Sequence, residues 1–187
     1  MPGQHFETGN FKKPTKKEYF LPNEEYGRAL RALVISTCDI AVLNSGGKLL
    51  LAKRTWEPAK GQFWIIGGRR IPGESFGESA LRNLKHELGI EVTPARFQYL
   101  GGYSMVFAKR RQAPKQDGVH TDSTVMIVHL SEQEMTAIEP NEEYSETQWF
   151  VLQDVVKRSS EFHPAIVQIS KDLLAAPSQG SFSFSER

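Results

Sequence analysis

The sequence predicts an α+β fold in which a mixed β-sheet lies between helices. Three observations predict it. Short apolar segments typical of strands outnumber segments with helical periodicity. One helical segment lies between strand segments, over residues 76–88, and another closes the chain over residues 163–175. Helices in these places would cover both faces of a sheet, which gives three layers: helix, sheet and helix.

The first half of the folded region contains three predicted strands and a helix. β-Branched and apolar residues predict a strand over residues 32–43, and the turn sequence at 44–47 leads into a second strand over 48–54. A third short apolar run, residues 63–66, ends at two glycines. Apolar residues then recur at helical spacing, up to a glycine that would end the helix: Phe76, Ala80, Leu84, Leu88 and Gly89.

The second half contains three more predicted strands, over residues 97–107, 123–130 and 147–152. The basic stretch 109–122 is too polar for a strand and is predicted to be a loop. Residues 163–175 have the apolar spacing of an amphipathic helix. This order of elements leaves the second helix free to close the domain.

Length and composition indicate one domain with two tails. The chain has 187 residues, of which 39% are hydrophobic and 24% charged, as is typical of globular proteins. Residues 1–28 are polar and carry scattered aromatics, so we predict an N-terminal arm that docks on a neighbour. We expect the folded domain over residues 29–176 and a flexible tail over 177–187.

Several functional classes are disfavoured by the same composition. The net charge of +1 argues against a nucleic-acid partner, because such proteins carry a basic surface. No apolar stretch approaches the roughly 20 residues of a membrane-spanning helix, so we expect no membrane partner. The lysine-rich start has no apolar segment behind it, and we expect no secretory signal. The single cysteine, Cys38, suits a reducing cytoplasm, which is the predicted location.

The stretch from Gly68 to Ile90 carries the chemistry. A strand ends in a Gly-Gly corner, a Pro-Gly loop reverses the chain, and a helix then passes the same corner. At about 100° per residue, positions 83 and 87 are offset by about 40° and positions 83 and 86 by about 60°. One helix face therefore directs an amide, an imidazole and a carboxylate at the corner. Oxygen ligands in such a cluster suit Mg²⁺.

This stretch resembles the Nudix box, the signature of the Nudix hydrolases. The pattern is a glycine, five residues, a glutamate, seven residues, and then an arginine with further glutamates, a glycine and apolar positions. Seven positions match: Gly68, Glu74, Arg82, Leu84, Glu87, Gly89 and Ile90. Asn83 and His86 stand where the pattern has glutamates. With one box-helix carboxylate kept, the stretch is similar to the GDP-mannose mannosyl hydrolase branch.

The resemblance implies a Nudix fold and a set of site residues. Glu87 and a backbone carbonyl of Gly67 or Gly68 would hold Mg²⁺, for which Mn²⁺ could substitute. Glu143 would be a further oxygen ligand. Three residues are expected to bind substrate: Arg54 and Arg69 at the diphosphate, where arginine binds bidentately, and Asp39 near the sugar. Arg82 would steady either the leaving phosphate or Glu74.

The general base is the point at which the sequence departs from that branch. The resemblance implies a histidine in the loop before Trp149, and Tyr144 stands there instead. A tyrosine, with an ordinary pKa near 10, is a poor base at neutral pH. We therefore predict Glu146 or His120 as the base for attack on carbon, and keep Glu143 and Glu146 as candidates for attack on phosphorus.

Three functions remain open at this point. The first is hydrolysis of a nucleoside diphosphate sugar, GDP-mannose or GDP-glucose first, at the sugar C–O bond. The second is cleavage of a P–O bond, as in a Nudix pyrophosphatase. The third is a Nudix module that binds a nucleotide without chemistry. The resemblance also implies a homodimer.

Overall fold

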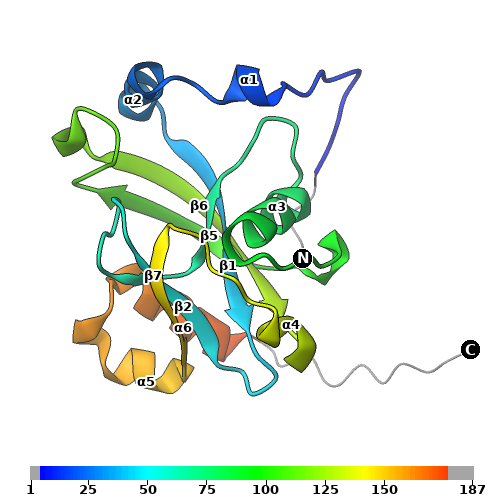
Figure 1. Ribbon diagram of the computed structural model, residues 1–187, viewed down its shortest axis with the longest axis vertical. Helices are drawn as coiled ribbons and strands as arrows, with labels where there is room; N and C mark the ends of the chain where they lie inside the picture. Colours follow the sequence, from blue (N-terminus) through cyan, green and yellow to red (C-terminus); the bar gives the residue numbers. More distant parts are fainter. Residues whose placement is uncertain (1–4, 177–187) are drawn as a thin grey trace, which may run out of the picture.

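Seven strands form one mixed β-sheet in the computed structural model, which describes residues 5–176 (Figure 1). The central path of the sheet runs β3-β2-β1-β6-β5, while β4 pairs with β1 and β7 pairs with β2. The strands are β1 Ile35–Leu43, β2 Leu49–Arg54, β3 Phe63–Trp64, β4 Ile66–Arg69, β5 Gln98–Phe107, β6 Val119–His129 and β7 Tyr144–Phe150. The helices are α1 Lys16–Tyr19, α2 Asn23–Ala32, α3 Phe76–Leu88, α4 Glu132–Thr136, α5 Leu152–Lys157 and α6 Pro164–Ala175.

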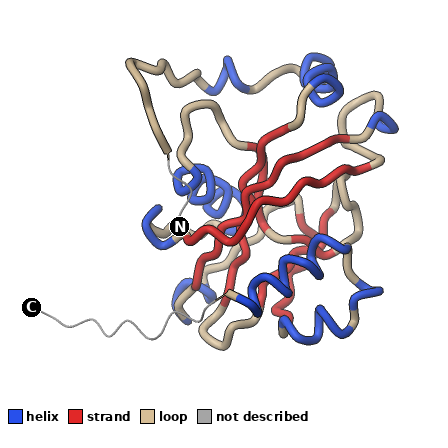
Figure 2. The backbone as a smooth tube through the Cα atoms, turned by 180° about the vertical axis from the view of Figure 1, so that it is seen from behind, coloured by secondary structure: helices blue, strands red, loops and turns tan. Residues whose placement is uncertain are grey.

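Helices cover both faces of this sheet, which confirms the predicted three layers (Figures 1 and 2). Along β1, Ile40 and Val42 belong to the core that contains the apolar residues of α3. Ala41 and Leu43 belong to the core under α5 and α6. Because side chains alternate along a strand, one strand serves both cores.

Strand β1 holds the centre of the fold and brings distant segments together. It runs parallel to β6, with Asp39 opposite Val125, and antiparallel to β4, with Asp39 opposite Gly67. The glycine corner, which is the Gly67-Gly68 pair within the short strand β4, therefore lies beside the middle of β1. Helix α3 passes the same corner and packs on β1 and β4.

The predicted elements are found, with four boundaries displaced by three residues or more. Strand β1 begins at Ile35 rather than residue 32, because Ala32 still belongs to α2. Strand β4 continues through the glycine pair to Arg69. The prediction of a loop over 109–122 was wrong at its end, since β6 begins at Val119 and gains its hydrogen bonds from β1 and β5. Strand β7 begins at Tyr144 rather than residue 147.

The segment before β1 is ordered into α1 and α2 and contacts its own domain. Arg69 Nη2 donates to the carbonyl oxygen of Tyr19 at 2.8 Å, and its guanidinium lies 4.9 Å from the ring centre of Tyr26. Leu30 on α2 is buried. The predicted tail over 177–187 lies outside the described residues. Within residues 5–176, no helix has both the length and the hydropathy needed to cross a bilayer.

Candidate active site

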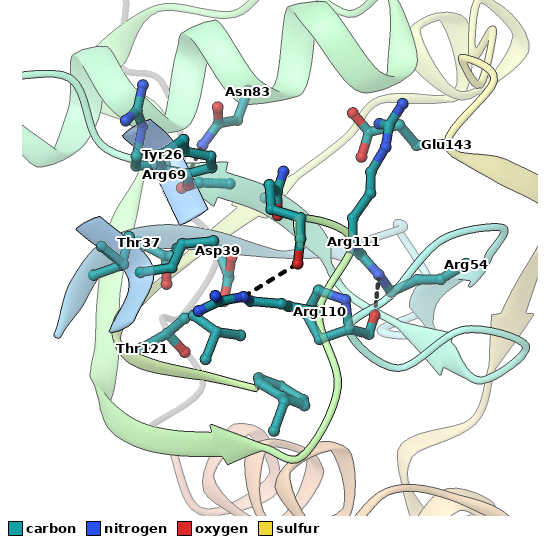
Figure 3. A pocket seen from close by; sticks show the side chains of 18 of the residues that line it. Tyr26, Thr37, Asp39, Arg54, Arg69, Asn83, Arg110, Arg111, Thr121 and Glu143 are labelled. Atoms are coloured by element: carbon teal, nitrogen blue, oxygen red, sulfur yellow. Dashed lines mark hydrogen bonds between the residues drawn. The ribbon is translucent and has the colours of Figure 1, made fainter. Parts of the chain in front are cut away.

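A cavity of about 930 Å³ opens at the glycine corner and extends to the N-terminal helices. Figure 3 shows Tyr26 and Arg69 toward one end of the pocket, Arg54 and Glu143 toward the other, and Asp39 between them. Its charged lining is mostly cationic: Lys16, Arg54, Arg69, Arg82, Arg110, Arg111 and Lys115 face Asp39, Glu87 and Glu143. An anionic ligand would therefore find a favourable field in this cavity.

Glu87 is the carboxylate that the fold buries at the corner, with 3% of its surface exposed. Its Oε2 accepts a hydrogen bond from the Gly67 backbone N–H at 3.0 Å and another from the hydroxyl of Tyr144. Burial raises the pKa of Glu87 to about 8, and the negative charge of Glu143 adds to the rise, while the two hydrogen bonds oppose it. The second oxygen, Oε1, faces Gly68.

Local sequence signals fix both ends of α3 and thereby place Glu87 at the glycine corner. Ser75 caps the helix by accepting from the backbone N–H of Glu78, and the Glu78 side chain returns a bond to the Ser75 N–H. Gly89 ends it at φ 71°, a left-handed conformation that glycine adopts without strain. Position 87 is therefore fixed from both ends of the helix.

Arg82 joins α3 to the loop that precedes it. Its Nη2 donates to Glu74 Oε2 at 2.8 Å and to the carbonyl oxygen of Arg69 at 2.9 Å. Of the two predicted roles, the geometry is that of steadying Glu74. Burial works to raise the pKa of Glu74, but hydrogen bonds from Arg82 and the Ile71 N–H outweigh it and hold that pKa below its ordinary value.

Asn83, which replaces a box glutamate, is buried and bonds to the backbone. Its Nδ2 donates to the carbonyl oxygens of Cys38 at 3.0 Å and Gly68 at 3.2 Å. A carboxylate has no N–H and could not make either bond. Asn83 therefore joins β1 to β4 across the corner where a glutamate would add negative charge.

The corner fits one hard cation by the chemistry of its donors. Within the described part of the chain, no three His, Cys, Asp or Glu side chains are grouped to hold a metal ion. Carboxylate oxygen Oε1 of Glu87 and Oδ1 of Asn83 lie 3.7 Å and 3.6 Å from where a Cβ of Gly68 would stand, so the glycine keeps this space open. Carboxylate and carbonyl oxygens are the ligands that Mg²⁺ takes, together with substrate phosphates and water.

Asp39 lies in the cavity wall, opposite Gly67. It is 6% exposed, and its Oδ2 accepts a hydrogen bond from the Ser123 hydroxyl at 2.5 Å. Burial raises the pKa of Asp39 to about 6, although the Ser123 bond and the charge of Arg54 both oppose the rise. A Cβ at Gly67 would collide with Asp39, so only glycine allows the two strands to approach here.

The NUDIX domain profile matches residues 35–172, which is most of the chain. The chain belongs to the Nudix family. The match covers every strand and the helices α3 to α5, and it ends within α6. It begins after α2, so the N-terminal helices lie outside the part that defines a Nudix domain.

Relatives and solved structures agree with the family. The low-salt glycan biosynthesis protein Agl8 of Haloferax volcanii is 30% identical over 81 residues, which are 43% of this chain and 49% of that protein. The CTP pyrophosphohydrolase of Escherichia coli K12 is 36% identical over 58 residues, 30% of this chain and 43% of that one. The chain thus spans about half the length of these relatives. The MutT protein of Methanosarcina mazei Go1 has a similar fold, with a TM-score of 0.61 at 16% identity over 76% of this chain and 94% of that chain.

The other predicted substrate and metal residues of this Nudix domain line the cavity, with partners of their own. Arg54 Nε donates to the carbonyl oxygen of Pro58 at 2.8 Å. Arg69 is engaged by Tyr19 and Tyr26, so the N-terminal segment orients it. The Glu143 side chain lines the cavity, and its backbone N–H donates to Asn141 at 2.9 Å.

Two residues predicted as the general base do not line the cavity, which corrects the sequence analysis. Glu146 lies on β7 opposite Lys53, with its carboxylate half exposed and 3.8 Å from the Lys53 ammonium. His120 bonds to Ser104 at 2.8 Å, while its neighbours Val119 and Thr121 line the cavity. Because side chains alternate along β6, His120 points to the opposite face. Residues 119–122 were predicted to be a loop, so the alternation of side chains along β6 could not be used to place His120.

Three contributions to the site were missed from the sequence. Tyr144 is buried and donates to Glu87, a role hidden when its position was compared with a histidine. Arg110 is 1% exposed in the cavity wall, although a run of basic residues usually indicates a wet loop. Tyr26 lines the cavity from the arm. Scattered aromatics in the arm were the available signal, but they did not say which surface they would cover.

Proposed function

We propose that the chain is a Mg²⁺-dependent hydrolase of nucleoside diphosphate sugars, GDP-mannose or GDP-glucose first, releasing free sugar and a nucleoside diphosphate. The observation that carries the proposal is the pairing of one buried carboxylate, Glu87, with a cationic cavity at the Nudix corner. Such a site has few carboxylates, which would gather metal ions to generate hydroxide. It has many basic side chains, which would stabilise a departing diphosphate.

The relatives support the two halves of this substrate. One is a glycan biosynthesis protein, which agrees with a sugar, and another acts on a nucleotide, CTP. Both likenesses are partial, and the proposal rests on the cavity rather than on them. These two names agree with the two components of the proposed substrate, a sugar and a nucleotide.

The position of each residue in the cavity indicates its role. Glu87 and a carbonyl oxygen of Gly67 or Gly68 would hold Mg²⁺, which supplies positive charge to the leaving diphosphate when bound. Arg54 and Arg69 would bind the diphosphate oxygens. Asp39, in the wall between the two ends of the pocket, would stabilise positive charge that develops on the sugar ring.

We now assign the general base to Glu143, since Glu146 and His120 do not line the cavity. Glu143 does line it, and its charge acts on Glu87, raising the pKa of that neighbour. Metal ligation would lower the basicity of this carboxylate, so we remove Glu143 from the predicted ligand set. In this assignment Glu87 is the single side-chain ligand.

The test is product analysis over a panel of nucleotide sugars with Mg²⁺, repeated with Mn²⁺. Free mannose or glucose and GDP are expected from the GDP-sugars, with Glu143→Gln strongly impaired. Formation of GMP and a sugar phosphate would favour the alternative, P–O cleavage, which the likeness to CTP pyrophosphohydrolase supports. A protein that binds GDP and turns over no member of the panel would be a binding module.

We also propose that the chain works as a homodimer. Large apolar side chains remain exposed near the N-terminal segment, among them Leu33 at 61% and Val34 at 53%. A partner subunit would remove this area from water. Sedimentation velocity at micromolar concentration should give the mass of a dimer, and a monomer at every concentration would refute this part of the proposal.

A further inference from the structure

One end of the cavity is built in part by helix α2, which lies outside the Nudix match, and in part by residues within that match. Helix α2 contributes Tyr26 and Leu30, and the loop between β5 and β6 contributes Arg110. The start of β1 contributes Ile35 and Thr37. Along β1, Ile35 lies four residues from Asp39, or about 13 Å at the rise of an extended strand. A ligand whose diphosphate lies at the glycine corner would extend one of its ends into this recess.

Helix α2 is held tightly against the loop of Arg110. A Cβ at Gly27 would collide with the carbonyl oxygen of Ala113, so the two backbones are in direct contact. Arg31 on the same helix lies 3.8 Å from Asp117 in that loop. Together with the Tyr26–Arg69 contact, these interactions fix α2 as one wall of the recess.

Arg110 brings a buried guanidinium to this recess. Three backbone carbonyls accept its hydrogen bonds: those of Gln112 at 3.2 Å, Gly118 at 3.1 Å and Ala113 at 3.5 Å. Asp117 lies 3.6 Å away and also faces Arg31, so the pairing is shared. Since a guanidinium has five N–H groups, donors remain for a ligand. Figure 3 shows the Arg110 side chain reaching toward Thr37, Asp39 and Thr121.

Two threonines add hydroxyl groups beside the guanidinium. Thr121 on β6 is 8% exposed and lines the cavity. The hydroxyl of Thr37 is buried, and it has no hydrogen-bond partner within the described residues. A buried hydroxyl without a partner costs free energy that a bound polar group would recover. Around these polar groups the walls are apolar, formed by Leu30, Ile35, Met105, Phe107 and Val119.

We propose that this recess binds the base of the nucleotide substrate, and that α2 and Arg110 select a base with a carbonyl edge. Apolar walls with a few polar groups suit a planar ring better than a hexose, which presents hydroxyls on every side. A guanidinium only donates hydrogen bonds, so it can donate to both O6 and N7 of guanine. Adenine offers it one acceptor, N7, beside an amino group that is itself a donor. This inference rests on the proposed nucleotide substrate and adds its specificity.

The test measures binding without turnover. Isothermal titration with GDP, ADP and inorganic pyrophosphate, each with Mg²⁺, compares wild type with Gly27→Ala. Alanine favours a helix more than glycine does, so a loss of affinity cannot come from a weaker α2. The new methyl group must instead push α2 off the loop of Arg110. We expect wild type to bind GDP at least tenfold more tightly than ADP. Gly27→Ala should lose at least tenfold in affinity for GDP and much less for pyrophosphate, whose loss is limited to the effect of α2 on Arg69 through Tyr26.

Arg28→Ala is the matched control, because Arg28 is exposed on the same helix one residue further along. It should bind all three ligands as wild type does. Arg110→Lys, which keeps the charge but not the planar fork, should lower the preference for GDP over ADP. Retained pyrophosphate affinity shows that each variant is folded.

Three results would overturn the inference. Wild type could bind GDP no more tightly than pyrophosphate, or no more tightly than ADP. Gly27→Ala could bind GDP as wild type does while losing affinity for GDP-mannose, which would place the sugar in the recess. Failure of the proposed function is distinguishable, because a protein that releases no sugar yet shows the GDP pattern loses only the hydrolase assignment.

Discussion

Burying the carboxylate of Glu87 carries a free-energy cost, and its neighbours determine how that cost is offset. The Gly67 N–H and the Tyr144 hydroxyl both donate to Oε2, which leaves Oε1 facing the corner at Gly68. Hydrogen bonds to a charged group are among the stronger ones, at about 1.5–3 kcal/mol each. The same two bonds therefore stabilise the charge and aim the remaining oxygen.

Replacement of this carboxylate tests the metal assignment directly. Glu87→Gln keeps the shape of the side chain and removes the charge, and we expect kcat to fall by about 10³-fold, or about 4 kcal/mol of transition-state stabilisation. The melting temperature should not fall, since a buried charge is removed. Glu146→Gln, on an exposed carboxylate of β7, is the control and should retain full activity. Turnover at the wild-type rate in Glu87→Gln would remove Glu87 from the site.

Tyr144 should act through Glu87 rather than on the substrate. Tyr144→Phe removes only the hydroxyl that donates to Oε2, so we expect kcat to fall about tenfold and the Mg²⁺ concentration for half-maximal rate to rise. KM should change little at saturating Mg²⁺. Steady-state kinetics at several Mg²⁺ concentrations separates these effects. A Phe variant with wild-type metal dependence would show that the orientation of Glu87 does not depend on this bond.

For single residues, the sequence predicted those whose role follows from their position in the Nudix box. It missed the residues that reach the site only through tertiary packing. Glu87, Arg82 and the glycine corner are close in sequence and share one helix–loop unit, so their spacing predicts their geometry. Tyr144 is 57 residues away from its partner Glu87. No local pattern reports such a contact. The hydrogen bonds of Arg110 are local, but helix α2, which packs beside its guanidinium, is distant in sequence.

At the scale of elements, helix α3 was predictable to its ends because its signals are local. Its cap at Ser75, its apolar period and the glycine after Leu88 all lie within the segment itself. The start of β6 was not predictable, because residues 119–122 become a strand only by pairing with β1 and β5. Pairing partners override polar composition, which is why β-propensity depends on context.

The contact between Arg96 and helix α4 should make stability depend on acid pH. Arg96 Nη2 donates to Glu134 Oε2 at 3.0 Å, and this bond is the main cause that lowers the pKa of Glu134 to about 2. Because the pKa of Glu134 is lower in the folded state than in the unfolded state, its ionised carboxylate stabilises the fold. This stabilisation is complete above the ordinary pKa of 4.5 and is lost as pH falls toward 2.

Thermal denaturation of Glu134→Gln against wild type between pH 2 and pH 7 measures this contribution. The variant should melt at a lower temperature at pH 7, and the difference should shrink between pH 4.5 and pH 2. Solvent screening will keep it small, since Arg96 is partly exposed. Glu24→Gln, on an exposed position of α2, should melt as wild type does at every pH. A gap for Glu134→Gln that does not change with pH would exclude the ion pair as its cause.

At the scale of the molecule, a nearly neutral chain concentrates its positive charge in one place. The net charge is +1, yet seven of the ten charged residues that line the cavity are basic. Composition predicted only the net charge, whereas the fold determines where the charged side chains lie. Asn83 contributes to it by standing where a box glutamate would add negative charge beside Glu87. The cavity is thus arranged to attract an anion rather than to gather metal ions.

This charge distribution leads to the prediction that water attacks the sugar carbon and not phosphorus. Attack on phosphorus needs a nucleophile to approach an anionic centre, which clusters of carboxylate-bound metal ions make possible. Here the buried carboxylates of Glu87 and Asp39 line a cavity in which basic residues outnumber acidic ones, so a departing diphosphate is better stabilised than an incoming hydroxide. Hydrolysis of GDP-mannose in ¹⁸O-water should place the label in free mannose, read by mass spectrometry, with none in GDP. Label in GMP or in mannose phosphate would make the enzyme a pyrophosphatase, with Glu143 activating the water that attacks phosphorus.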